Sequence, residues 1–169
     1  MTTVVAGLAL LFGVPLLTPQ DPAGPGPAAP PPSSAGPAPT VAPVATVDLA
    51  ARQLTMPRSG DREARTVPIT SGRKETPTAT GRMTVTALSA TRVIEGKLIG
   101  LTDQYDYRAS WVVELSGPAG QTTYALAFPS QSKELFGRLD ATDGALGLPE
   151  ADAKWLFQHL RLGDVVEIR

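Results

Sequence analysis

The prolines of this 169-residue chain are concentrated toward one end. Eleven of its seventeen prolines lie between Pro15 and Pro43, where Asp21 is the only charged residue. A segment so rich in proline and so poor in large apolar residues cannot bury enough surface to offset the entropy lost on ordering. The sequence therefore divides near residue 44 into a tail and a body, 44–169, that is long enough to bury a core of its own.

The tail itself has two parts. It begins with an uncharged apolar run, Val4–Leu17, which is shorter than the about 20 residues that span a bilayer and is typical of a signal peptide. Residues 1–18 are predicted to be a signal peptide or short membrane anchor; a short buried helix is the alternative. Residues 19–43, rich in proline, alanine and glycine, are predicted to be a disordered linker, with a proline-rich ligand as the alternative. We therefore expect an exported protein, secreted or anchored in the cell envelope.

Charge and composition exclude several kinds of site. The formal net charge of −1 gives no electrostatic reason to expect a nucleic-acid partner. The chain has no cysteine and one histidine, which excludes a disulfide framework, a thiol nucleophile and a multi-histidine metal site within one chain. No phosphate-binding glycine loop or dinucleotide motif is present. We expect no cofactor, no metal and no nucleic acid, and contact with a membrane only through the N-terminal segment.

Alternation of apolar and polar residues predicts strands along the body. The expected strands are Val44–Leu49, Arg52–Met56, Ala64–Thr70, Gly81–Leu88, Ser110–Leu115, Thr122–Phe128 and Val165–Ile168. A glycine-containing turn, Gly117–Gly120, joins two of them as a hairpin. Strands this short and closely spaced indicate a mainly β fold, either a sandwich or a mixed sheet.

One helix is expected near the end of the chain, over Pro149–Leu162. Proline at its start and acidic residues in the first turn are typical of a helix N-terminus. The apolar positions recur every three or four residues, as on one face of a helix: Ala153, Leu156, Phe157 and Leu160. Gly163 is expected to end the helix.

Two blocks of the body resemble a known family. Val47–Val85 contains a predicted hairpin and then, at Ser71–Val85, the pattern S-G-x-x-x-T-P-T-x-T-G-x-x-x-V, and Gly144–Arg169 contains the predicted helix and the final strand. In this order the blocks resemble the opening and the closing of an L,D-transpeptidase catalytic domain of the YkuD type, and the resemblance implies a short active-site strand that runs into the helix. The resemblance implies that residues 44–169 form one such domain, a β-sandwich or mixed sheet with one helix near the C-terminus.

The resemblance also implies an active-site motif, Ser-His-Gly-Cys-x-Arg, just before that helix, and a His-Gly pair upstream. The matching positions in this chain are Thr142, Asp143, Gly144, Ala145 and Gly147, with Phe128 near the upstream pair. The nucleophilic cysteine is thus replaced by Ala145, the histidine by Asp143 and the anion-holding arginine by Gly147. L,D-transpeptidation proceeds through a thioester and therefore needs this cysteine. Because the cysteine, the histidine and the arginine are all absent from these positions, the motif is not intact.

Other residues are candidates to substitute for the missing groups. They are the pair Thr142 and Asp143, the pair Asp140 and Asp143, Ser130, Ser132 and His159. Neighbours in a strand point to opposite faces, the serines have no evident base, and solvated loop carboxylates or a half-exposed helix histidine are the ordinary explanations. Tyr105, Tyr107, Arg108 and Trp111 could form a stacking patch, although aromatic packing is favoured.

Three functions remain open on the sequence. The first is a non-catalytic exported domain that binds peptidoglycan stem peptides or a cell-wall protein. The second is an active enzyme, either an atypical L,D-transpeptidase or another peptidoglycan-modifying enzyme. The third is a structural envelope domain without a ligand. The missing motif favours the first and the third.

Overall fold

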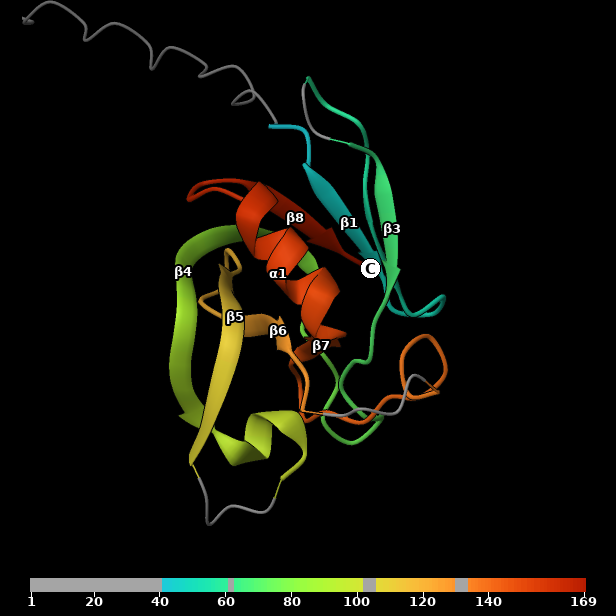
Figure 1. Ribbon diagram of the computed structural model, residues 1–169, viewed down its shortest axis with the longest axis vertical. Helices are drawn as coiled ribbons and strands as arrows, with labels where there is room; N and C mark the ends of the chain where they lie inside the picture. Colours follow the sequence, from blue (N-terminus) through green and yellow to red (C-terminus); the bar gives the residue numbers. More distant parts are fainter. Residues whose placement is uncertain (1–40, 61–62, 102–105, 130–133) are drawn as a thin grey trace, which may run out of the picture. The chain divides into compact units, whose positions relative to one another are not determined.

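The computed structural model describes residues 41–60, 63–101, 106–129 and 134–169 (Figure 1). The predicted signal peptide and most of the predicted linker lie outside the described residues and stay predictions. Within the described ranges, no helix has the length and apolar character needed to cross a membrane.

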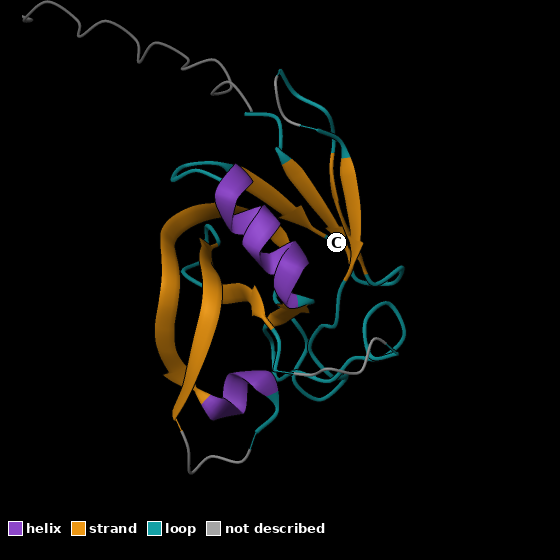
Figure 2. Ribbon diagram, in the orientation of Figure 1, coloured by secondary structure: helices purple, strands orange, loops and turns teal. Residues whose placement is uncertain are grey.

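Strands dominate the body, and the mainly β prediction is confirmed (Figure 2). The strands are β1 (Ala45–Asp48), β2 (Gln53–Met56), β3 (Arg65–Pro68), β4 (Gly81–Glu95), β5 (Asp106–Ser116), β6 (Thr122–Ala127), β7 (Leu146–Leu148) and β8 (Val165–Ile168). The helices are a short 3₁₀ helix, η1 (Gly96–Ile99), and α1 (Glu150–His159), which is the one α-helix of the described residues.

All eight strands belong to one mixed sheet, in the order β3-β2-β1-β8-β4-β5-β6-β7. The sheet is antiparallel except where β1 pairs with β8 and β6 pairs with β7. The last strand, β8, therefore lies in the middle of the sheet, between β1 and β4 (Figure 1). The two sequence blocks that resemble the family meet there, because β4 begins within the first block and β8 closes the second.

The sheet curves until its two ends meet. A register shift between Val85 and Ala87 in β4 bends that long strand, as β-bulges do. After β3, Thr70 exchanges two backbone hydrogen bonds with Gly147 of β7, each 2.8 Å long. One residue further, the backbone of Ser71–Arg73 pairs with Thr142. The segment that follows β3 is thereby fixed beside the segment that carries the motif positions.

Two apolar clusters lie on opposite faces of the sheet. The larger cluster takes buried side chains from every strand and from α1, which packs against β5 and β6. The smaller cluster lies under the far end of the β4–β5 hairpin and is formed by Ile94, Ile99, Ala109, Val112, Leu126 and Ala145. Neighbours such as Val112 and Val113 enter different clusters, because successive strand residues point to opposite faces.

The structure corrects the predicted end of the helix. α1 ends at His159, and Leu160 is already extended, with φ −82° and ψ 152°. Gly163, with φ +87°, belongs to a turn before β8, where its N–H donates to the carbonyl of Val85. The helix is shorter because this turn must deliver the chain to the centre of the sheet. The sequence also missed η1 and the second half of β4, whereas the short strand that the resemblance implies before the helix is β7.

Candidate functional site

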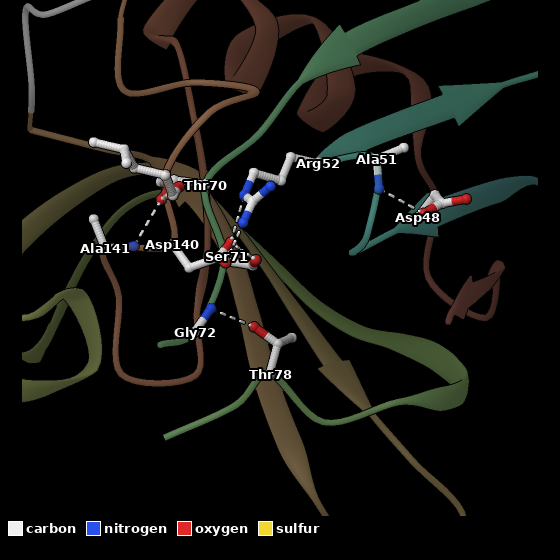
Figure 3. Close-up of polar contacts among 10 residues, drawn as sticks. Asp48, Ala51, Arg52, Thr70, Ser71, Gly72, Thr78, Asp140 and Ala141 are labelled. Atoms are coloured by element: carbon white, nitrogen blue, oxygen red, sulfur yellow. Dashed lines mark hydrogen bonds and ion pairs between the residues drawn. The ribbon is translucent and has the colours of Figure 1, made fainter. Parts of the chain in front are cut away.

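Four of the motif positions, Thr142–Ala145, lie on the loop that leads into β7, and Gly147 lies in β7 itself. Figure 3 shows Asp140 and Ala141, which anchor the N-terminal side of this loop. The Asp140 carboxylate accepts hydrogen bonds from Arg52 Nε at 3.0 Å and Nη2 at 2.7 Å, and from Ser71 Oγ at 2.8 Å. The buried Thr70 hydroxyl donates to the Leu139 carbonyl and accepts from the Ala141 N–H. The hydrogen bonds of Arg52 hold the pKa of the Asp140 carboxyl below its ordinary value.

Asp143, which the resemblance aligns with a histidine, is held by a second arginine. Its Oδ1 accepts from Arg73 Nε at 3.0 Å, from Arg73 Nη2 at 2.5 Å and from Thr76 Oγ1 at 2.5 Å. The hydrogen bonds from Arg73, and then that from Thr76, lower the pKa of the Asp143 carboxyl. Its backbone N–H donates to the Leu98 carbonyl of η1 at 3.1 Å. The side chain is a fixed carboxylate, with only 14% of its surface exposed.

Thr142 and Asp143 do not form a nucleophile–base pair. The Thr142 hydroxyl is buried and donates to the carbonyl of Ala145 at 2.6 Å, whereas Asp143 binds Arg73 and Thr76. Asp140 and Asp143 are each paired with a different arginine, so the structure does not bring them together as a hydrolytic pair. Ser130 and Ser132 lie outside the described residues.

Gly147 and Phe128 are packed against each other. A Cβ atom added to Gly147 would lie 2.6 Å from Cγ2 of Thr70 and 2.8 Å from Cδ2 of Phe128. The Phe128 ring also meets the Phe136 ring edge to face, with centroids 6.4 Å apart. The position that the resemblance gives to an arginine therefore has no room for any side chain. The sequence could not show this, because the contact joins three distant segments.

A pocket of about 210 Å³ opens at three of the motif positions. Its lining residues are Pro77, Ala79, Leu98, Thr122, Thr123, Tyr124, Asp143, Gly144 and Ala145. The structure thus brings Asp143, Gly144 and Ala145 to one pocket, while Thr142, Gly147 and Phe128 pack outside its lining. Asp143 is the one charged side chain in that lining, and the Thr123 hydroxyl is already bound to the Gly144 carbonyl at 2.6 Å.

The remaining candidates lie elsewhere. His159 is at the end of α1, where its Nδ1 is 2.7 Å from the Trp155 carbonyl and its ring stacks on the Trp155 ring at 4.4 Å. Trp111 packs edge to face on Phe157 at 5.5 Å, so it serves the contact between β5 and α1. Tyr107 packs against the smaller apolar cluster, Arg108 is exposed, and Tyr105 lies outside the described residues.

Comparison with known proteins gives one family and one fold. Residues 42–168 match the family model described as the L,D-transpeptidase catalytic domain, YkuD. Among solved structures, the chain is 23% identical to the L,D-transpeptidase LdtMt1 in complex with imipenem, with a TM-score of 0.60. It is 22% identical to an L,D-transpeptidase from Mycobacterium smegmatis, with a TM-score of 0.58, and 17% identical to one from Stackebrandtia nassauensis, with a TM-score of 0.56.

These likenesses cover the body of the chain and part of each relative. Each match spans 74% of this chain, and it spans 57%, 57% and 54% of the three solved structures in turn. The chain thus spans less than two thirds of their length. A search of curated proteins gives no significant match. Because these sequence identities are low, the solved structures show that the chain has a similar fold and are not evidence of its activity.

Proposed function

Since the chain belongs to the L,D-transpeptidase catalytic-domain family, YkuD, we propose that it is a non-catalytic member that binds a cell-wall peptide in the pocket at its motif positions. The observation that carries the proposal is the pocket itself, whose lining includes Ala145, the residue that the resemblance aligns with the nucleophile. The ligand class that follows from the family resemblance is the peptidoglycan stem peptide.

The chemistry supports a non-catalytic role. A thioester route needs a thiolate, a base that activates it and donors that stabilise the tetrahedral intermediate. The chain has no cysteine, and Asp143 is committed to Arg73 and Thr76. In a well-studied serine hydrolase, loss of the nucleophile alone costs roughly 10⁶ in rate. The supporting histidine and arginine are missing as well, because the resemblance aligns them with Asp143 and Gly147.

The pocket has the size and lining of a binding site for one side chain. Its volume of about 210 Å³ is below that of sites for drug-sized molecules, which begin at about 300 Å³. Apolar walls from Pro77, Ala79 and Leu98 face hydroxyl-bearing residues on β6. A peptide would insert one residue here and lie along the rim with the rest.

The N-terminal sequence supports export as part of the same proposal. An apolar run followed by a proline-rich segment would place the domain outside the cytoplasm, either free or held by an N-terminal anchor. Such a location would bring the pocket to the cell wall, where stem peptides are found.

Binding and turnover should be measured together on the full chain. We expect tetrapeptide muropeptides to bind in a calorimetric titration, with no acyl transfer and no mass shift from a carbapenem. Thr122→Trp would fill the pocket from its exposed lining and should abolish binding, while Thr66→Trp, on an exposed position of β3, should not. Cross-linking by the unmodified protein would establish an enzyme. Absence of binding would leave a structural envelope domain.

A further inference from the structure

The pocket at the motif positions has walls from four segments of the chain. They are Pro77 and Ala79 in the loop between β3 and β4, Leu98 in η1, Thr122–Tyr124 in β6, and Asp143–Ala145 in the loop before β7. Only the β6 wall is part of a strand, so the shape of the pocket depends on contacts that hold two loops and a short helix together. The residues that make those contacts affect what the pocket can bind, whether or not they line it.

The loop that carries Asp143–Ala145, called the motif loop below, is tied to each of the other walls by hydrogen bonds. Asp143 Oδ1 accepts its hydrogen bonds from the loop between β3 and β4. The Asp143 N–H donates to the Leu98 carbonyl of η1 at 3.1 Å. The Thr123 hydroxyl of β6 donates to the Gly144 carbonyl at 2.6 Å. Asp143 therefore connects two of the three walls to the motif loop.

Arg73 makes most of the contacts that hold Asp143. Its Nε and Nη2 donate to Asp143 Oδ1 at 3.0 Å and 2.5 Å, and Thr76 Oγ1 donates the third hydrogen bond. The Arg73 N–H donates to the Thr142 carbonyl at 2.9 Å. A Cβ atom added to Gly100, just after η1, would lie 3.6 Å from Arg73 Nη2. Arg73 thus reaches both the motif loop and the end of η1, yet it does not line the pocket.

The ion pair between Arg73 and Asp143 is partly open to solvent. The exposed fraction of the Arg73 side chain is 47%, whereas that of Asp143 is 14%. Because exposed ion pairs contribute little to the stability of a fold, the domain should stay folded without Arg73. The covered Asp143 carboxylate would then have lost its cation, which favours its turning toward water. The motif loop would separate from the loop between β3 and β4.

We propose that Arg73 is a positioning residue of the pocket, which sets the spacing of three of its walls by holding Asp143 and so controls the affinity for the bound peptide. This inference rests on the proposed function and names a residue outside the pocket on which binding depends. A site whose walls are already held in place binds more tightly, because less conformational freedom is lost on binding.

The test measures muropeptide affinity of variants of the full chain by calorimetric titration. Arg73→Gln removes the charge and should weaken binding of a tetrapeptide muropeptide about tenfold. Arg73→Lys keeps the charge and should retain part of the affinity.

Arg65→Gln is the matched control. The ion pair of Arg65 with Asp152 is similar in exposure, with fractions of 39% and 15%, but it joins β3 to α1 and neither residue lines the pocket. This variant should bind the muropeptide as tightly as the unmodified protein.

Hydrogen exchange gives a readout that needs no ligand. Because the Asp143 amide donates to the Leu98 carbonyl, its exchange rate reports whether the motif loop stays on η1. Exchange should be faster in Arg73→Gln than in the unmodified protein, intermediate in Arg73→Lys and unchanged in Arg65→Gln.

The outcomes separate this inference from the function on which it rests. Unchanged affinity or unchanged Asp143 exchange in Arg73→Gln would overturn the inference, and so would equal losses of affinity in Arg73→Gln and Arg65→Gln. If Arg73→Gln does not fold, Arg73→Lys replaces it, and affinity equal to that of the unmodified protein would then overturn the inference. If muropeptides do not bind the unmodified protein, the proposed function is wrong, and the exchange rates alone decide whether Arg73 positions the motif loop.

Discussion

Gly147, which the resemblance aligns with an arginine, leaves no space for a side chain. Because the added Cβ would overlap with Thr70 and Phe128, the neighbours have closed over the position. Its φ is not in the left-handed region, so the demand for glycine comes from space and not from the backbone. Phe128 and Gly147 therefore pack against each other, and an arginine at 147 would overlap with Phe128 and Thr70.

Gly147→Ala should lower the free energy of unfolding by about 1–3 kcal/mol, as overpacking of a core does. The closest contact is with Cγ2 of Thr70, so Thr70→Ser should recover part of the loss while keeping the hydroxyl that binds Leu139 and Ala141. Urea denaturation of the two single variants and the double variant measures the coupling free energy between positions 70 and 147. If Gly147→Ala lowers the free energy of unfolding equally with threonine and with serine at position 70, the packing argument is wrong.

Ala145→Cys alone should stay inactive in acyl transfer and should not capture a carbapenem. A thiol there would keep a pKa near about 8.5, and the nearby Asp143 carboxylate would raise it, so little thiolate would form at neutral pH. Any recovery of activity would need at least Asp143→His and Gly147→Arg as well. An arginine at 147 would in turn require smaller residues at 70 and 128. Activity of the single variant would refute the argument.

The two paired carboxylates should make stability depend on pH. A carboxyl whose pKa is lower in the folded protein than in the unfolded chain stabilises the fold above the unfolded value of about 3.9. That stability is lost as the pH falls through the pKa of the folded protein. Asp140 and Asp143 are two such carboxyls, because their arginine partners lower their pKa values. The double variant Asp140→Asn, Asp143→Asn should thus lose less stability between pH 5 and pH 2. An unchanged profile would mean that the ion pairs contribute nothing.

At the scale of elements, α1 is the helix that covers the larger apolar cluster. Leu156 is 1% exposed, and Leu156→Ala should cost about 2–5 kcal/mol, the range for truncating a buried leucine. Gln158→Ala, on the exposed face of the same helix, should change the free energy of unfolding little. Chemical denaturation compares them. Similar effects of the two variants would place the helix outside the core.

Local patterns predicted those elements that have clear periodicity. The hairpin of β5 and β6 and the start of α1 follow from alternation and from Pro149 with its acidic neighbours. β7 followed from the family resemblance and not from periodicity, because its three residues are all buried and show no alternation. The predicted end of α1 was wrong because Gly163 belongs to a later turn, whose position is set by its hydrogen bond to Val85 of β4.

The candidate site, like the fold, could be predicted from the sequence only in part. The family resemblance placed Asp143, Gly144 and Ala145 together, and the structure gathers them at one pocket. It did not indicate that Arg73 and Thr76 hold Asp143, nor that Thr70 closes the space at Gly147. Those contacts join residues about 65 to 80 positions apart, and no spacing in the chain encodes them.

At the scale of the whole molecule, the body should not need the tail. We expect deletion of residues 1–43 to leave the melting temperature of the domain unchanged within about 2 °C, because the proline-rich sequence cannot bury apolar surface. Within the described residues, the contact that the deletion removes is a surface hydrogen bond from Arg82 to the Val41 carbonyl. Calorimetry of the two forms checks this, and a sharp drop would mean that the tail packs on the body.

The central place of β8 has a consequence for how the domain folds. The strands made first, β1 to β3, and those made next, β4 to β7, are joined within the sheet by β8, which inserts between β1 and β4. Apart from the contacts of Thr70 and Gly72 with Gly147 and Thr142, the two halves are joined through β8, so β1 and β4 cannot be linked across the centre of the sheet until Val165–Ile168 has been synthesised. Contacts between such distant segments form slowly. The centre of the sheet is thus the part of the domain that is completed last.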